Sequence, residues 1–178
     1  MLTVGIRSNI LEDITITAHN TFAELLRNIL RKLQSQGATV ATAESCTGGL
    51  VATMLTESPG SSAVFVGGIS AYANGVKTSM LGVGPSDLER FGAVSAEVAR
   101  SMAAGARDRL GATYAVALTG IAGPDGGSPG KPVGTVYCGI ASPFGEVVTR
   151  LTLSGDRSTI RRTAAESALQ LLADAIKD

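Results

Sequence analysis

The chain has 178 residues, of which 44% are apolar, and its 15 basic and 15 acidic side chains give a net charge of zero. This length and composition predict one domain with a substantial core. The balanced charge argues against nucleic acid or an anionic membrane as a partner. Aromatic residues make up only 4%, which argues against a stacking platform for single-stranded nucleic acid.

The cysteines and the N-terminal segment indicate the compartment. Cys46 and Cys138 are the two cysteines, too few for a disulfide framework, so we expect both to be reduced. The sequence has no basic-plus-apolar leader and no apolar run long enough to cross a membrane. We therefore expect a cytoplasmic protein.

Residues 1–17 alternate weakly between apolar and polar and predict an edge strand or an N-terminal arm. Thr21 and Glu24 have the capping-box spacing and predict the start of an amphipathic helix, which Gly37 ends. The apolar face of this helix is formed by Phe22, Leu25, Leu26, Ile29, Leu30 and Leu33.

Strand patterns alternate with helical patterns along the rest of the chain. Ser86 with Glu89, and Ser95, have the spacing of helix caps. The expected strands are residues 38–44, 63–73, 113–120, 132–142 and 145–153. The expected helices are residues 21–36, 50–55, 74–81, 86–91, 95–110 and 157–176. The last two strands flank Pro143–Phe144–Gly145 as a hairpin. This order predicts an α/β fold, a three-layer α/β/α sandwich with a mixed, mostly parallel sheet.

The stretch AESCTGG places small and polar residues where a predicted strand meets a predicted helix. Backbone N–H groups at such a junction favour a phosphate or a developing oxyanion, and Gly48 and Gly49 would let a ligand approach the backbone. One interpretation is therefore a chemical site with Ser45 or Cys46 as the nucleophile. The other is an ordinary helix cap made by Ser45 or Thr47.

The chain has one histidine, His19, and this scarcity limits the possible catalytic bases. A single histidine ahead of the first predicted helix argues against Ser–His–Asp catalysis, Cys–His catalysis and a histidine-ligated metal. Cys46 then reads better as a packing residue, because nothing in the pattern would activate its thiol.

A buried neutral lysine is an alternative base for Ser45. Lys77 follows the predicted strand 63–73, near Tyr72 and Asn74. If that strand lies beside strand 38–44, Lys77 and Tyr72 converge on the serine. The alternative is a solvent-exposed lysine next to a boundary tyrosine.

Two further segments predict ligand contacts. Residues 120–134 contain six glycines and three prolines directly after the most apolar strand, which is typical of a ligand-binding loop. The loop matches neither the P-loop nor the dinucleotide-binding spacing. Further on, Arg157 is a candidate clamp for a phosphate or carboxylate, and Asp156 is a candidate cap of the last helix.

Six motifs in one order, TAESCTGG, YANGVK, GAVS, TGIAGPDGG, KPVGTV and SGDR, resemble one known family. It is the C-terminal domain of the competence/damage-inducible protein A family, whose enzymatic members are nicotinamide mononucleotide amidohydrolases. The resemblance covers roughly residues 20–176. It implies an α/β/α sandwich, residues 18–178 as an amidohydrolase-like domain, and the stand-alone form, since the larger domain of the wider family has no counterpart here.

The resemblance also implies the site and the reaction. The catalytic residues are Ser45 as nucleophile with Tyr72 and Lys77, and the glycine-rich segment of the family falls on Thr119 to Gly127. Substrate-binding positions are expected at Glu44, Thr47, Gly48, Gly49, Asn74, Thr119, Gly120, Gly123 and Arg157. The reaction is deamidation of nicotinamide mononucleotide to nicotinate mononucleotide and ammonia, which recycles pyridine nucleotide. Gly75 and Val76 depart from the family pattern, which often has an acidic residue there.

The expected mechanism has neutral Lys77 taking the Ser45 proton, directly or through Tyr72, with N–H groups near Thr47, Gly48 and Gly49 holding the oxyanion. It needs no cofactor and no metal. We expect a small-molecule nucleotide as partner, no nucleic acid, no membrane, and a homodimer. The alternatives are a non-catalytic nucleotide-binding module and a Ser–Lys amidase for another small amide.

Overall fold

The computed structural model describes the backbone of residues 9–177 and the side chains of residues 22–177. Within these residues five strands form one sheet in the order β2-β1-β3-β4-β5. The strands are β1 (Val40–Glu44), β2 (Phe65–Ser70), β3 (Tyr114–Gly120), β4 (Thr135–Ser142) and β5 (Gly145–Thr152). Strand β1 is parallel to β2 and β3, whereas β4 is antiparallel to β3 and to β5. Four of the five strands therefore share one direction, which confirms the mixed, mostly parallel sheet.

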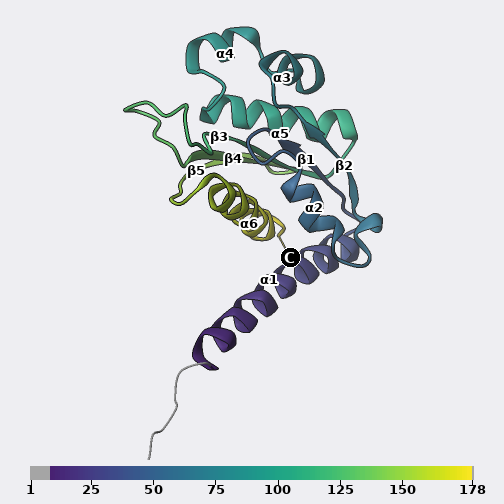
Figure 1. The fold of residues 1–178 in the computed structure, drawn as a ribbon. Coiled ribbons are helices and arrows are strands. Elements are labelled where there is room, and N and C mark those ends of the chain that lie inside the picture. The colour runs from purple at the N-terminus through teal and green to yellow at the C-terminus, as the bar shows by residue number, and fades with distance from the viewer. Residues whose placement is uncertain (1–8, 178) are drawn as a thin grey trace, which may run out of the picture.

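Helices cover both faces of the sheet, as Figure 1 shows. Helix α5 lies on one face, and α3 and α4 lie outside it; helices α6, α2 and α1 lie on the other face. The helices are α1 (Asn9–Ser35), α2 (Leu50–Thr56), α3 (Asn74–Leu81), α4 (Pro85–Phe91), α5 (Ala96–Leu110) and α6 (Arg157–Ala175), with a short 3-10 turn, η1 (Ser61–Ala63). The three-layer prediction is confirmed.

The two faces of the sheet have different cores. The core between the sheet and α6 contains large side chains, such as Leu118 from β3 and Ile160 and Leu169 from α6. The face under α5 is built mainly from alanine, with Ala41, Ala43, Ala115, Ala117 and Ala141 in the strands. Small side chains on the strands let α5 lie close to the sheet, and a Cβ atom on Gly139 of β4 would already overlap the Ala99 carbonyl oxygen of α5.

The start of α1 corrects one prediction. The helix begins at Asn9 rather than at Thr21, so Thr21 is not its cap and residues 9–17 are not an edge strand. Apolar residues at Ile10, Ile14 and Ala18 continue the four-residue spacing of the later helix, and this periodicity outweighs the short alternation. Residues 1–8 and the side chain of His19 lie outside the described residues.

Of the other three predicted helix caps, two are confirmed and one is wrong. The Ser95 side chain accepts a hydrogen bond from Val98 N–H, and Asp156 accepts one from Thr159 N–H at 2.7 Å, so both predicted caps are confirmed. Ser86 is not a cap, because α4 begins one residue earlier at Pro85. Proline suits that first position, since its fixed φ is already helical and its missing N–H has no partner there.

Candidate active site

The sheet brings together Ser45 and Lys77, two of the three predicted catalytic residues. Ser45 directly follows β1, and its N–H donates to the Leu118 carbonyl on β3 at 2.9 Å. Strand β2 runs parallel to β1 with Ser70 beside Glu44, and α3 begins four residues further on. The carboxyl ends of parallel neighbours meet at one edge of the sheet, so Lys77 in the first turn of α3 faces Ser45.

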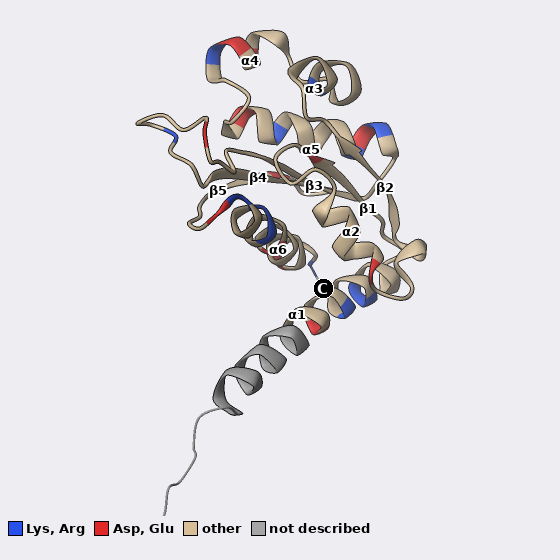
Figure 2. Cartoon of the chain, in the orientation of Figure 1, with Lys and Arg blue, Asp and Glu red and all other residues tan. Residues whose placement is uncertain are grey.

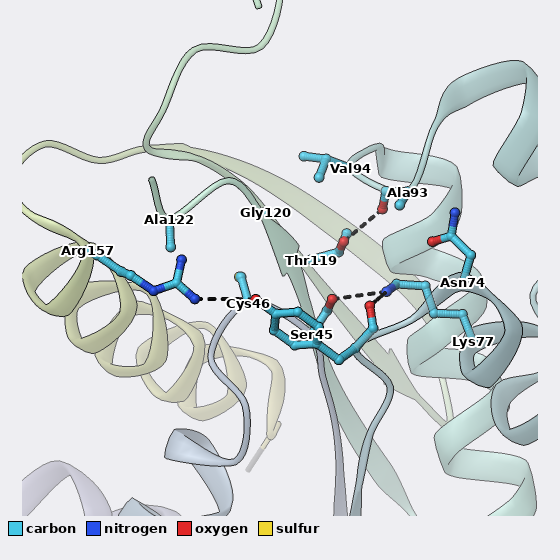
Figure 3. Close-up of a pocket in the computed structure, with 11 residues that line it drawn as sticks. Ser45, Cys46, Asn74, Lys77, Ala93, Val94, Thr119, Gly120, Ala122 and Arg157 are labelled. Atoms are coloured by element: carbon cyan, nitrogen blue, oxygen red, sulfur yellow. Dashed lines mark hydrogen bonds between the residues drawn. The ribbon is translucent and has the colours of Figure 1, made fainter. Parts of the chain in front are cut away.

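Lys77 makes three hydrogen bonds at this edge. Its Nζ lies 3.0 Å from Ser45 Oγ, 2.8 Å from the Ala71 carbonyl oxygen and 3.0 Å from the Tyr72 carbonyl oxygen. Only 1% of the lysine is exposed. Figure 3 shows the side chain reaching from its helix towards Ser45. Burial lowers the pKa of Lys77 below its usual 10.5 because the charged form loses its water.

The three partners of Lys77 favour a neutral amine that faces the serine. The two carbonyl groups can only accept, so they take two N–H groups. A neutral amine has two N–H groups and one lone pair, and the remaining tetrahedral direction points at Ser45 Oγ. In that state the serine hydroxyl donates to Lys77. The arrangement can therefore remove the Ser45 proton directly.

A cavity of about 210 Å³ opens beside Ser45. It brings together seven predicted site residues: Ser45, Tyr72, Asn74, Lys77, Thr119, Gly120 and Arg157. The remaining lining residues are Cys46, Ala93, Val94 and Ala122. The structure does not place Glu44, Thr47, Gly48, Gly49 or Gly123 in this lining. Their predicted contact with a substrate stays a prediction.

Glu44 is buried behind the cavity and caps α2. Its carboxylate accepts hydrogen bonds from the N–H groups of Gly49 at 2.9 Å, Val51 at 3.1 Å and Ala52 at 3.0 Å. The predicted cap by Ser45 or Thr47 is wrong, because this carboxylate takes the place of a shorter capping side chain. The partial positive charge of the helix terminus is thereby already matched by an anion.

The loop between Glu44 and α2 uses its glycines for backbone shape. Gly48 and Gly49 have φ values of +64° and +109°, a left-handed conformation that favours glycine. Gly49 N–H is bound to Glu44, so it is not a free oxyanion donor. Thr47 is fully buried, and its hydroxyl has no hydrogen-bond partner among the described residues.

Tyr72 and Arg157 meet at the rim of the cavity. Tyr72 is 63% exposed, and its hydroxyl accepts a hydrogen bond from Arg157 Nη2 at 3.3 Å. Arg157, the first residue of α6, also donates from Nη1 to the Gly123 carbonyl at 2.7 Å. The tyrosine hydroxyl thus bonds to arginine rather than to Ser45 or Lys77. The direct transfer from Ser45 to Lys77 is the route that this geometry supports.

The glycine-rich loop contributes only its first residues to the cavity. Thr119 donates its hydroxyl to the Ala93 carbonyl at 2.7 Å, which joins the loop to the GAVS segment. Further along, Lys131 Nζ donates to the Phe91 carbonyl at 2.8 Å and ties the loop to the end of α4.

Cys46 lines the cavity but is a poor nucleophile. Burial raises the pKa of its thiol to about 11, so the thiolate is scarce near neutral pH. The interpretation of Cys46 as a packing residue next to the reactive serine agrees with its 7% exposure.

One contact went unnoticed in the sequence. Arg161 on α6 donates from Nε to the Cys46 carbonyl at 3.1 Å and from Nη2 to the Thr47 carbonyl at 2.7 Å. Its spacing of four residues from Arg157, on one helix face, is the signal that would have pointed to it.

Comparison with known proteins decides the family. The model of the CinA C-terminal domain matches residues 22–176. The chain belongs to the CinA C-terminal domain family. It is 50% identical over 157 residues to a CinA-like protein of Trichormus variabilis, covering 86% of this chain and 37% of that protein. With one of Mycolicibacterium vanbaalenii it shares 55% identity over 141 residues, covering 79% of this chain and 33% of the other. The chain thus spans about a third of the length of these relatives.

Solved structures of the CinA superfamily have the same fold. The competence/damage inducible protein CihA from Agrobacterium tumefaciens has a TM-score of 0.84 at 45% identity, over 88% of this chain and 96% of that chain. A CinA superfamily protein from Enterobacter cloacae has a TM-score of 0.84 at 30% identity, over 99% of both chains. The resemblance drawn from the six motifs is confirmed.

The surface and the helices add two findings. Figure 2 shows acidic and basic positions interspersed over the described parts of α1, α4 and α5, in keeping with a net charge of zero. Among the described residues no helix is both long enough and apolar enough to cross a bilayer.

Proposed function

We propose that this CinA-family chain deamidates nicotinamide mononucleotide to nicotinate mononucleotide and ammonia, with Ser45 as nucleophile and Lys77 as base. The observation that carries the proposal is the 3.0 Å contact between Lys77 Nζ and Ser45 Oγ, with the other two Lys77 contacts made to carbonyl oxygens. Membership of the CinA family supports the choice of substrate.

The reaction proceeds through an acyl-enzyme. Lys77 takes the Ser45 proton while Oγ attacks the carboxamide carbon, and the C–O bond forms as the carbonyl becomes an oxyanion. Collapse of this intermediate breaks the C–N bond, and the proton held by Lys77 goes to the departing ammonia. Water, deprotonated by the same amine, then attacks the ester, and Ser45 regains its proton as nicotinate mononucleotide leaves.

Arg157 and Tyr72 are the proposed groups for the rest of the nucleotide. Arg157 is the one charged residue besides Lys77 in the described lining, and a guanidinium suits a phosphate. The Tyr72 ring stands exposed beside it, and an aromatic face attracts a cationic pyridinium ring. In this proposal the bound phosphate replaces the Tyr72 hydroxyl as the hydrogen-bond partner of Arg157, and the freed hydroxyl then acts as a proton donor.

The test is ammonia release from nicotinamide mononucleotide by wild type and three single variants. Ser45→Ala is expected to lower kcat by about 10⁴-fold or more, as loss of a nucleophile does. Cys46→Ala should retain activity, because its thiol stays protonated. Ser79→Ala, an exposed serine on α3, is the matched control and should equal wild type.

Other outcomes would redirect the assignment. Full activity in Ser45→Ala would remove the serine from the mechanism. Nucleotide binding by calorimetry without ammonia release from wild type would favour a non-catalytic binding module. Equal turnover of free nicotinamide and the nucleotide would favour a general small-amide amidase.

A further inference from the structure

Arg161 lies behind the loop that follows the nucleophile, and its hydrogen bonds to that loop go to backbone carbonyls. Its guanidinium donates to the carbonyls of Cys46 and Thr47, at 3.1 Å and 2.7 Å. The side chain is half-buried, and no carboxylate among the described residues pairs with it. One planar cation therefore holds two successive peptide groups in one orientation.

Peptide geometry turns this clamp into a direction for the N–H groups. In a trans peptide the C=O and the following N–H point in opposite directions. The single cis bond of the described chain is Gly123–Pro124, so both clamped peptides are trans. With both carbonyls turned to Arg161, the N–H groups of Thr47 and Gly48 point away from it.

Cys46 connects the clamped backbone to the cavity, because Cys46 belongs to the cavity lining whereas Thr47 and Gly48 do not. The N–H of the residue after a nucleophilic serine is a common oxyanion donor. Bonding a carbonyl to a cation also polarises its peptide and strengthens the N–H as a donor.

We infer that Arg161 is a positioning residue for the reaction at Ser45: by binding the carbonyls of Cys46 and Thr47 it fixes the backbone directly after the nucleophile, whose N–H groups stabilise the oxyanion. The inference rests on the proposed function, which supplies the oxyanion. It assigns no contact between Arg161 and the substrate. Of the predicted oxyanion donors Thr47, Gly48 and Gly49, the N–H of Gly49 is excluded because it is bound to Glu44.

The experiment compares Arg161→Met, Arg161→Lys and Arg162→Met. Methionine keeps the aliphatic stem but removes both donors, and lysine restores one cationic donor. Arg162 is the matched control, since its side chain is 68% exposed and forms an ion pair with Glu166 at 3.7 Å on the same helix. Thermal unfolding of each variant identifies any that does not fold, and Arg161→Lys keeps the test open if Arg161→Met is one.

Kinetics should separate positioning from a merely structural role. Arg161→Met is expected to lower kcat by about 10- to 100-fold, less than or equal to the loss of one direct oxyanion donor, while KM stays within about threefold. Arg161→Lys should recover part of kcat, and Arg162→Met should equal wild type. An unchanged kcat in Arg161→Met, or an equal loss in Arg162→Met, would overturn the inference.

A second readout does not depend on turnover. Pyridine-3-boronic acid can form an adduct in which Ser45 Oγ bonds to boron, boron becomes a tetrahedral anion, and the serine proton passes to Lys77. Arg161→Met should weaken this binding by the same factor as kcat, without weakening the binding of nicotinate mononucleotide. If wild type releases no ammonia, the proposed function fails, and the boronate still decides the role of Arg161. Boronate binding that is absent, or unchanged in Arg161→Met, would refute that role.

Discussion

Lys77 combines full burial with partners that supply no negative charge. Its three neighbours are two carbonyl oxygens and the Ser45 hydroxyl. A buried lysine normally gains a carboxylate partner, which would hold its pKa up. Here burial lowers that pKa, and a proton acceptor at Ser45 becomes available closer to neutral pH.

The low pKa of Lys77 predicts a pH-dependent stability difference. The folded pKa lies below the unfolded value of 10.5, so between these values the unfolded chain binds more protons. The resulting penalty is fully present below the folded pKa and disappears as pH rises to 10.5. Relative to Lys77→Met, the free energy of unfolding of wild type should therefore increase with pH.

Urea unfolding of wild type and Lys77→Met at several pH values up to 10.5 measures this difference. Lys177→Met, at an exposed position, is the control and should follow wild type at every pH. The lowered pKa would be contradicted if the difference in unfolding free energy between wild type and Lys77→Met did not change with pH. It would also be contradicted if Lys77→Met gained stability relative to wild type as pH rises.

At the scale of elements, the start of α2 depends on one carboxylate. Helix α2 has seven residues, and its N-cap, Gly49, has no side chain to cap it. Glu44, the last residue of β1, instead accepts hydrogen bonds from three N–H groups that have no partner within the helix. The strand and the helix are thus joined across the loop that carries Ser45.

Removing this carboxylate should destabilise the fold. Glu44→Ala leaves three N–H groups without their buried charged acceptor, and we expect a loss of about 2–4 kcal/mol. Glu57→Ala, at the exposed end of the same helix, should change stability by less than about 0.5 kcal/mol. Urea unfolding at pH 7 measures both. Equal stabilities for the two variants would show that the Glu44 contacts contribute little.

At the scale of the whole molecule, the outer helix α3 is held in place by α5. A Cβ atom on Gly105 of α5 would overlap the Leu81 carbonyl oxygen at the end of α3. Helix α5 in turn packs on the alanine-rich face of the sheet. The position of Lys77 relative to Ser45 therefore depends on two successive layers of close packing.

Two glycine substitutions test this dependence. Alanine at Gly105 would gain about 1 kcal/mol of helix propensity, but the overlap should reverse this to a net loss of about 1–3 kcal/mol and lower kcat by shifting Lys77. Gly75→Ala in α3 meets no atom within 4 Å and should leave kcat unchanged while slightly raising stability. Thermal unfolding and ammonia release measure both. A fully active, more stable Gly105→Ala variant would contradict the packing argument.

The departure at Gly75–Val76 can now be placed. Gly75 is exposed near the start of α3, and Val76 packs beside the alanine-rich core. An acidic side chain at residue 75 would stand at a helix N-terminus and outside the described cavity lining.

The homodimer remains a prediction, which sedimentation equilibrium would measure.

The sequence alone was sufficient for the order and type of most elements. Hydrophobic periodicity reports which face of a segment is buried, and this predicted all five strands and the length of α3. Parallel neighbours end at one edge of a sheet, so Ser45 and Lys77 could be expected to meet. Periodicity also led to the wrong start of α1, where a short alternation was preferred to the longer helical spacing.

The tertiary structure decided where side chains point and which groups they use. Glu44, expected at the substrate, turns to the helix behind the cavity, and the Tyr72 hydroxyl bonds to Arg157 instead of Ser45. Arg161 reaches a loop that is 114 and 115 residues away in the chain. Residue order fixes neither choice, because each depends on which donors and acceptors the packed layers bring within hydrogen-bond distance.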